Sequence, residues 1–183
     1  MLAGTIDGAR RGDQESLELL YRNHVGMVYG YLRACGIADA EDLTSEVFVG
    51  VLKGLPSFVG GPNEFRTWLM TIAYRRMVDY RRHKSTDKTV VQQAVEVAEL
   101  TPDDLSDPFA VEIDPRLIAA FSTLTTAQRE VVALRFVADL GLDRVAQITN
   151  RPVGAVKSLQ HRGLSTLRSA LSDLGVTSEV LIR

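Results

Sequence analysis

LDRVAQITNRPVGAVKSLQHRGL, residues 142–164, decides the fold, because its spacing is that of a helix-turn-helix. A small residue, Ala146, stands where the two helices would cross. Asn150 stands at the turn, and asparagine tolerates the left-handed backbone conformation better than most residues. Pro152 favours the first turn of a new helix, and Val156 is placed to anchor that helix against the first one. The stretch therefore predicts two helices that cross over a small apolar contact.

The second helix of this motif would carry a face suited to DNA. We expect the first helix over 142–149 and the second over 153–171. The outward side chains of the second helix are small, hydroxylated, imidazole or cationic, and belong to Ala155, Lys157, Ser158, His161 and Arg162. Such side chains suit a helix that enters the major groove and also contacts phosphates. The alternative is an ordinary surface helix with scattered charges.

The N-terminal half of the chain has the periodicity of three further helices. Apolar residues recur at spacings of three and four over 14–34, and again over 39–55, where acids crowd the first turn. SFVGGPN, residues 57–63, indicates a loop, and a third helix follows over 64–83. These segments predict a helical N-terminal domain.

Helical signals return near the start of the C-terminal domain. Pro115 suits the start of a helix, and Thr125 or Thr126 suits the cap of the next helix. No segment shows the strict alternation of a strand, and no internal repeat is found. We therefore expect an all-α fold of two small helical domains, the second of which contains the helix-turn-helix.

The net charge of −2 is unevenly distributed along the chain. Residues 1–84 hold 11 Lys and Arg against 10 Asp and Glu, residues 85–115 hold one against eight, and residues 116–183 hold nine against five. The middle segment also loses the amphipathic pattern, apart from a short helix expected near 90–100. We therefore predict domains over 1–84 and 115–183, joined by a flexible acidic linker over 85–114.

Several classes of protein are disfavoured by composition. Cys35 is the single cysteine, so no internal disulfide or C-x-x-C zinc pair can form, and we expect it to be a small buried residue on a helix. The N-terminus lacks the apolar segment of a signal peptide, and no run of about 18 apolar residues predicts membrane insertion. A cytoplasmic protein is expected. We find no nucleophile or phosphate-loop motif, and we expect no enzyme activity, metal or cofactor.

The acids near the start of the second predicted helix allow two interpretations. Asp39, Glu41, Asp42 and Glu46 have no nearby histidine pair that would favour a metal or acid–base site. They form either a solvated helix N-terminus or a docking surface for basic residues of a partner.

The predicted helix over 64–83 combines cations with aromatic residues. Arg75 and Arg82 are seven residues apart and share a face that can follow a phosphate backbone, and Arg76 repeats the relation with His83. Exposed rings at Trp68, Tyr74 and Tyr80 would stack on unpaired bases. For Phe65 and Trp68, a place in the core is the favoured interpretation.

Three stretches in this order resemble the extracytoplasmic-function (ECF) sigma factors. AEDLTSEVF, residues 40–48, is similar to the family segment that docks on the clamp helices of the largest polymerase subunit. FRTWLMTIAYRRMVDYRR, residues 65–82, is similar to the segment that opens and contacts the −10 element. Residues 124–168 resemble the domain that contacts the −35 element. The resemblance implies that residues 57–63 capture a base flipped from the −10 non-template strand.

The resemblance also implies a set of site residues and partners. Docking would fall on Asp42, Leu43, Glu46, Val47 and Phe48, and −10 contacts on Arg66, Trp68, Tyr74, Arg75, Arg76 and Arg82. The expected partners are core RNA polymerase, through the clamp helices and the flap of the second-largest subunit, and promoter DNA; an anti-sigma factor is a further candidate. A regulator that binds operator DNA as a dimer is the alternative function.

Parts of the motif depart from the family pattern. Thr149 and Arg151 stand where the family usually has apolar residues, and Leu159 and Gln160 replace a common basic–apolar pair. The family linker threads the polymerase cleft, so the acids of this linker suggest a mimic of RNA, and the alternative is a plain solvated spacer.

Overall fold

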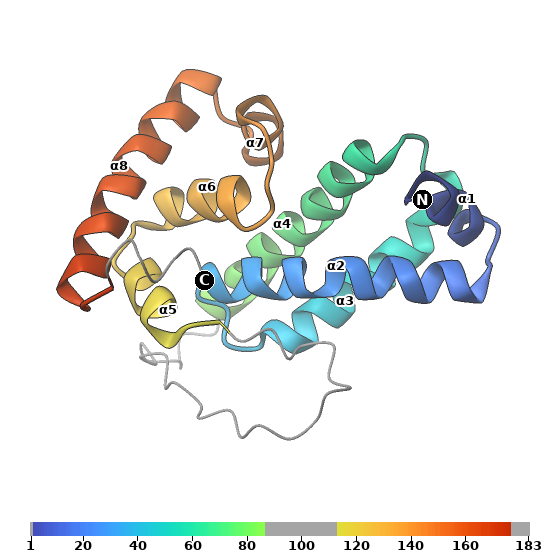
Figure 1. Cartoon of the computed structure of the whole chain (residues 1–183), viewed down its shortest axis with the longest axis horizontal. Coiled ribbons are helices and arrows are strands. Elements are labelled where there is room, and N and C mark those ends of the chain that lie inside the picture. Colours follow the sequence, from blue (N-terminus) through green and yellow to red (C-terminus); the bar gives the residue numbers. More distant parts are fainter. Residues whose placement is uncertain (1, 87–112, 177–183) are drawn as a thin grey trace.

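The computed structural model describes residues 2–86 and 113–176, and these residues form helices joined by short connections (Figure 1). Within these two ranges there is no strand, so the all-α fold expected from the sequence is confirmed. No helix in the same ranges is long and apolar enough to cross a membrane. In chain order the elements are α1 (Leu2–Arg10), α2 (Gln14–Ala34), α3 (Ala40–Gly54), the 3-10 helix η1 (Leu55–Ser57), α4 (Pro62–Thr86), α5 (Pro115–Ser122), α6 (Thr126–Phe136), α7 (Leu142–Thr149) and α8 (Val153–Asp173).

The N-terminal domain consists of α1 to α4 around a core that α2, α3 and α4 supply. Asp13 begins α2 by accepting a hydrogen bond from the amide of Ser16 at 2.9 Å. Helix α2 has the predicted bounds, and α4 extends beyond its predicted range at both ends. The apolar stripes of the three helices meet in residues that are almost fully buried, among them Val28, Tyr31, Leu32, Val47, Val51, Phe65, Leu69 and Met77.

Two elements of this domain lie outside the predicted helices. Helix α1 packs on α2 and buries Ile6 and Ala9. Tertiary packing therefore stabilises a segment whose glycines lower its intrinsic helix propensity. The 3-10 turn η1 continues from α3 and shortens the loop predicted at 57–63.

The C-terminal domain begins with two well-defined helix caps. The carboxylate of Asp114 accepts a hydrogen bond from the amide of Arg116 at 2.8 Å, with Pro115 in the first turn of α5. Thr125 and Gln128 form a reciprocal capping box at the start of α6, which selects Thr125 from the two predicted caps. Asp114, assigned to the acidic linker, thus has a structural role at the edge of the second domain.

The two domains pack against each other. Helix α2 contacts α5 and α6, and α4 contacts α7 (Figure 1). One cluster of buried apolar residues runs through both domains. Cys35 lies at this boundary as the C-cap of α2, and its burial raises the pKa of the thiol to about 12. The predicted short helix near 90–100 and most of the predicted linker lie outside the described residues.

Candidate nucleic-acid interface

The helix-turn-helix forms as its spacing predicts. Asn150 ends α7 with φ 52° and ψ 46°, in the left-handed region. The amide of Arg151 then donates to the carbonyl of Ala146 at 3.0 Å and closes the turn. Val145 and Val156 are buried between the two helices, and Pro152 caps α8 instead of occupying its first turn. This turn fixes α8 across α7.

Two of the departures from the family pattern have local explanations. Thr149 is buried, and its hydroxyl donates to the carbonyl of Val145 at 2.7 Å, so the polar group is satisfied inside the domain. Gln160 accepts a hydrogen bond from Nε of Arg135 at 2.9 Å. The amide of Gln160 thus ties α8 to α6 and is engaged within the protein.

All five residues predicted to contact the −35 element lie on one exposed face of α8: Ala155, Lys157, Ser158, His161 and Arg162. The hydroxyl of Ser158 donates to the carbonyl of Gly154 at 3.0 Å, and its oxygen can still accept a hydrogen bond. The face therefore offers two cationic side chains together with hydroxyl and imidazole groups.

The α4 helix and the segment before it form one wall of a cleft. Phe65 is fully buried, whereas Trp68 is partly exposed and packs on Phe58 with ring centroids 5.0 Å apart. The cleft has a volume of about 570 Å³, and its lining includes Trp68 and Arg75 on one wall and Arg144 on α7 opposite. Phe65 therefore belongs to the core, and Trp68 can present one edge to a ligand.

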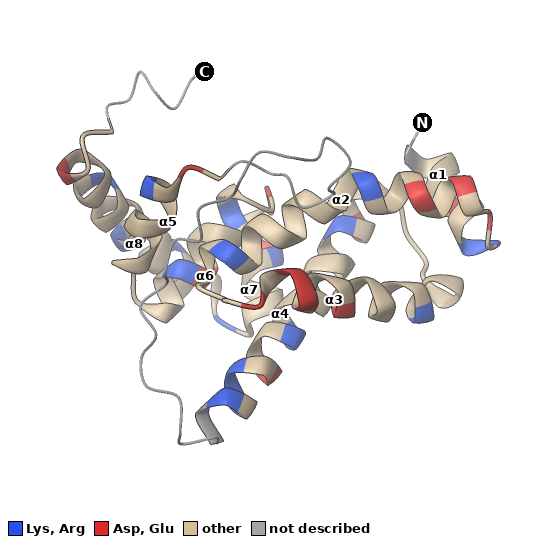
Figure 2. Cartoon of the chain, turned by 90° about the horizontal axis from the view of Figure 1, so that it is seen from below, with Lys and Arg blue, Asp and Glu red and all other residues tan. Residues whose placement is uncertain are grey.

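The other residues predicted for the −10 element are divided among different surroundings. Arg75, Arg76 and Arg82 are exposed, and Lys and Arg positions recur along the free end of α4 (Figure 2). Arg66 forms an ion pair with Asp139 of the C-terminal domain at 3.2 Å. Tyr74 is half-buried, and this burial raises the pKa of its hydroxyl. Trp68 and Arg75 thus line the same cleft, whereas Tyr74 is not part of its lining.

The residues predicted for polymerase docking separate into two groups. Asp42 and Glu46 are exposed on α3. Leu43, Val47 and Phe48 are buried in the domain core, because they form the apolar stripe of the same helix. These three side chains are turned into the core and offer almost no surface to a partner, so their predicted docking role is corrected to a structural role.

Two apolar residues that the sequence interpretation missed complete the exposed face of α3. Val49 and Leu52 are 48% and 53% exposed. Val49 lies three residues after Glu46, and Leu52 lies three residues after Val49, along the outward side of the helix. The signal that could have found them is an apolar residue off the core stripe of an amphipathic helix. The face is acidic toward the start of α3 and apolar toward its end.

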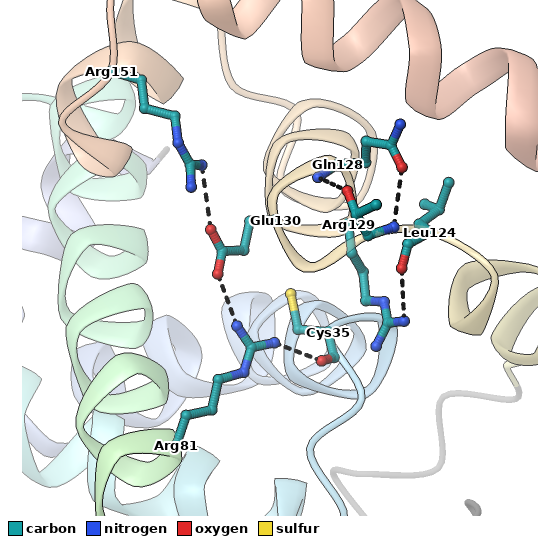
Figure 3. Close-up of polar contacts among 8 residues, drawn as sticks. Cys35, Arg81, Leu124, Gln128, Arg129, Glu130 and Arg151 are labelled. Carbon is teal, nitrogen blue, oxygen red and sulfur yellow. Dashed lines mark hydrogen bonds and ion pairs between the residues drawn. The ribbon is translucent and has the colours of Figure 1, made fainter. Parts of the chain in front are cut away.

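A buried carboxylate between the domains was also missed. Glu130 of α6 is 5% exposed and lies between Arg81 of α4 and Arg151 of the helix-turn-helix turn (Figure 3). Local periodicity carries no signal for such a contact, because Arg81 and Glu130 are 49 residues apart. Within residues 2–86 and 113–176, no group of three or more His, Cys, Asp or Glu side chains is placed to hold a metal ion.

The helix-turn-helix with its exposed cationic helix, which faces a second helical domain across an arginine-lined cleft, defines a DNA-binding protein. Two family models match it, Sigma-70 region 2 over residues 20–86 and Sigma-70 region 4 over residues 120–169. The ECF RNA polymerase sigma factor BldN of Streptomyces coelicolor is 31% identical over 181 residues, which cover 92% of this chain and 65% of BldN.

A second relative covers more of its own length. The ECF RNA polymerase sigma factor SigX of Bacillus subtilis is 30% identical over 170 residues, which cover 88% of this chain and 86% of SigX. The fold is also similar to CnrH, solved in complex with the cytosolic domain of CnrY, with a TM-score of 0.64, 22% identity, and coverage of 94% of this chain and 97% of CnrH. The chain belongs to the ECF family of RNA polymerase sigma factors. It is a sigma factor that directs promoter-specific transcription, and a dimeric operator-binding regulator is not favoured.

Proposed function

We propose that three exposed faces on separate helices make the contacts that transcription initiation requires: one with the −35 element, one with the −10 element and one with core polymerase. The observation that carries this proposal is that the chain presents a cationic helix-turn-helix face on α8, an aromatic and arginine-lined cleft beside α4, and an acidic and apolar face on α3. A sigma factor needs two DNA contacts and one polymerase contact, and the three faces match these in kind.

The α8 face contacts the −35 element. Lys157 and Arg162 supply charge for phosphates or for guanine edges. The hydroxyl of Ser158 can accept from base edges, and His161 can donate to them or accept from them. Ala155 leaves space for close approach of the helix to the groove. Buried Val156 holds this face outward, because the helix is anchored from behind.

The wall of the cleft that belongs to the N-terminal domain contacts the −10 strand. A flipped base costs a few kcal/mol to extrude, so a preformed surface must hold it. Phe58 and Trp68 supply two packed rings on that wall, and Arg75 lies about two helical turns further along α4 to contact phosphate. Arg76 and Arg82 extend the cationic surface along the helix beyond the cleft.

The α3 face docks on the clamp helices of the largest polymerase subunit. Asp42 and Glu46 would meet basic side chains of the polymerase, and Val49 and Leu52 would be buried in the contact. The C-terminal domain would contact the flap of the second-largest subunit. An anti-sigma factor would act by covering one or more of these faces.

Reconstitution tests this assignment. Purified core polymerase from the source bacterium, with fragmented genomic DNA, should yield specific transcripts only when the chain is added. The starts of these transcripts should share sequence upstream at −10 and −35. Transcripts independent of the chain, or starts without shared upstream sequence, would contradict the proposal.

A further inference from the structure

The contact between the two domains is centred on one buried carboxylate (Figure 3). Oε1 of Glu130 accepts from NH1 of Arg81 at 2.7 Å, and Oε2 accepts from NH1 of Arg151 at 3.3 Å. NH2 of Arg81 donates at 2.7 Å to the carbonyl of Cys35. A carboxylate so deeply buried is tolerated only when it is paired, and half of its pairing comes from the other domain.

Surface ion pairs accompany this contact at the other end of the boundary. Arg66 pairs with Asp139 at 3.2 Å, and Arg144 pairs with Glu64 at 3.9 Å. In both pairs each side chain is at least 40% exposed, so water and salt screen them. Among the inter-domain ion pairs of the described residues, loss of Arg81–Glu130 is therefore the most costly, because it leaves a buried charge uncompensated.

The closed arrangement covers part of the face that we assign to the −10 element. Arg144, Gln147 and Ile148 of α7 form the wall opposite Trp68 and Arg75. Arg66, another −10 candidate, is occupied by Asp139. In contrast, the assigned −35 face of α8 stays exposed. One DNA contact is thus available in this arrangement and the other is obstructed.

The dimensions of a promoter also show that the closed arrangement cannot contact both DNA elements at once. The −35 and −10 elements are roughly 25 base pairs apart by their names, which corresponds to about 85 Å of duplex at about 3.4 Å per base pair. Helix α7 contacts both α4 and α8. The two assigned DNA-facing helices are therefore separated at that point by little more than one helix diameter, about 10 Å. Contact with both elements at once requires the domains to separate.

We propose that Arg81, Glu130 and Arg151 form a latch that holds the sigma factor closed, obstructs its −10 face, and must break before both promoter elements are contacted. Arg151 stands where the family usually has an apolar residue, and its charge balances the carboxylate from within the C-terminal domain. When the domains separate, Glu130 keeps Arg151, which lies in its own domain, and loses Arg81, which lies in the other domain. This inference rests on the proposed function for its consequence, because it concerns access to the assigned −10 face.

The chain contains two native reporters of opening. Cys35 is its only cysteine and lies beneath the contact, with Arg81, Glu130 and Arg129 close enough to influence its ionisation. Trp68 is its only tryptophan and lines the cleft opposite α7. Opening exposes the thiol to reagents in solution and moves the indole into a more aqueous environment.

The test measures the reaction rate of Cys35 with Ellman's reagent and the emission wavelength of Trp68, in the free chain without polymerase or DNA. Glu130→Gln and Arg81→Gln each remove one charge from the latch, and each should raise the rate about tenfold or more and shift the emission to the red. The double variant should exceed neither single variant by much, because both break the same contact. Asp139→Asn is the matched control at the exposed pair and should behave as wild type.

The circular dichroism of each variant must show wild-type helix content. If Glu130→Gln loses helix content, the test rests on Arg81→Gln. Arg81 is partly exposed, so its replacement is expected to leave the fold intact. Wild-type rates and emission in a folded Arg81→Gln chain would overturn the latch, as would an equal change in Asp139→Asn.

A second measurement separates the latch from the assigned −10 face. A short single-stranded thymidine oligonucleotide should quench Trp68 more strongly in Arg81→Gln than in wild type. If Cys35 becomes reactive but the oligonucleotide quenches neither protein, the domains open as proposed and the −10 assignment fails.

Discussion

A Cβ atom added to Gly163 would lie 2.7 Å from Cγ2 of Val132. Gly163 is buried on α8, where that helix packs on α6, and the absence of a side chain lets the two helices approach closely. The same crossing sets the direction in which α8 carries its exposed cationic face. A glycine in the middle of a helix thus positions the assigned −35 surface.

Gly163→Ala should therefore destabilise the C-terminal domain. Overpacking lowers the free energy of unfolding by about 1–3 kcal/mol, and the better helix propensity of alanine offsets up to about 1 kcal/mol of this loss. Gly154→Ala on the same helix is the matched control, since nothing lies within 4 Å of its added Cβ. Urea unfolding should show a loss of stability for the first variant and no loss for the second. Equal stability of the two would contradict the close packing of α6 and α8.

The start of α3 should respond to pH through Asp39. Its carboxylate accepts from the hydroxyl of Tyr80 at 2.5 Å and from Nζ of Lys84 at 3.1 Å, and these hydrogen bonds hold the pKa of Asp39 below its ordinary value of 3.8. The ionised group therefore stabilises the folded chain above that value, and the stabilisation is lost as the pH falls through the lowered pKa.

Asp39→Asn should be less stable than wild type at neutral pH, by less than about 1 kcal/mol because the group is half-exposed. The difference should disappear in acid. Tyr80→Phe is the companion variant and should show a similar pH dependence. Thermal unfolding from pH 2 to pH 8 measures both, and a difference that grows as the pH falls would refute the assigned hydrogen bonds.

Removal of the α8 face should abolish selection of the −35 element. The variant with Lys157, Ser158, His161 and Arg162 all changed to alanine should bind core polymerase normally but lose −35-dependent transcription. Each base contact removed should cost roughly 1–3 kcal/mol. Single-alanine variants assayed on promoters with one changed base would show which side chain contacts which position. Normal transcription by the quadruple variant would place the −35 contact elsewhere.

Docking should depend on the exposed side of α3 and not on its buried stripe. Reversing the charges of Asp42 and Glu46, or changing Val49 and Leu52 to serine, should weaken core polymerase binding without loss of stability. Leu43→Ala should instead destabilise the domain by about 2–5 kcal/mol, because it leaves a cavity in the core.

A charge reversal at Asp173, exposed near the end of α8, is the control for net charge. Competition binding against a labelled wild-type chain gives the affinities. Wild-type affinity for the Asp42 and Glu46 reversals would show that docking lies on another surface.

Local features of the fold were predictable because they depend on a few neighbouring residues. The left-handed Asn150, the Thr125 cap and the bounds of α2 follow from turn chemistry, capping and apolar spacing. Helix α1 was not predictable in this way. Its stability depends on the burial of Ile6 against the rest of the domain, which local propensity does not contain.

For the candidate sites too, residues fixed by local sequence were predictable, and residues fixed by tertiary packing were not. The α8 face was predictable because the motif fixes which residues point outward. On α3, a family segment was assigned without its helical face, so buried Leu43 and Val47 were included and exposed Val49 was missed. The pairing of Arg81 with Glu130 depends on how two domains meet, and periodicity within either one carries no such information.

Equilibrium binding of the purified chain to core RNA polymerase and to promoter DNA, each alone and then together, tests the central claim most directly. We predict one chain bound per core enzyme, weak and salt-sensitive binding of DNA by the chain alone, and specific promoter binding only by the combined complex. Reversal of Asp42 and Glu46 should weaken binding of the chain to core polymerase and, as a result, promoter binding by the combined complex. Tight binding of duplex DNA by a dimer of the free chain, with no affinity for core polymerase, would contradict sigma-factor function for this chain.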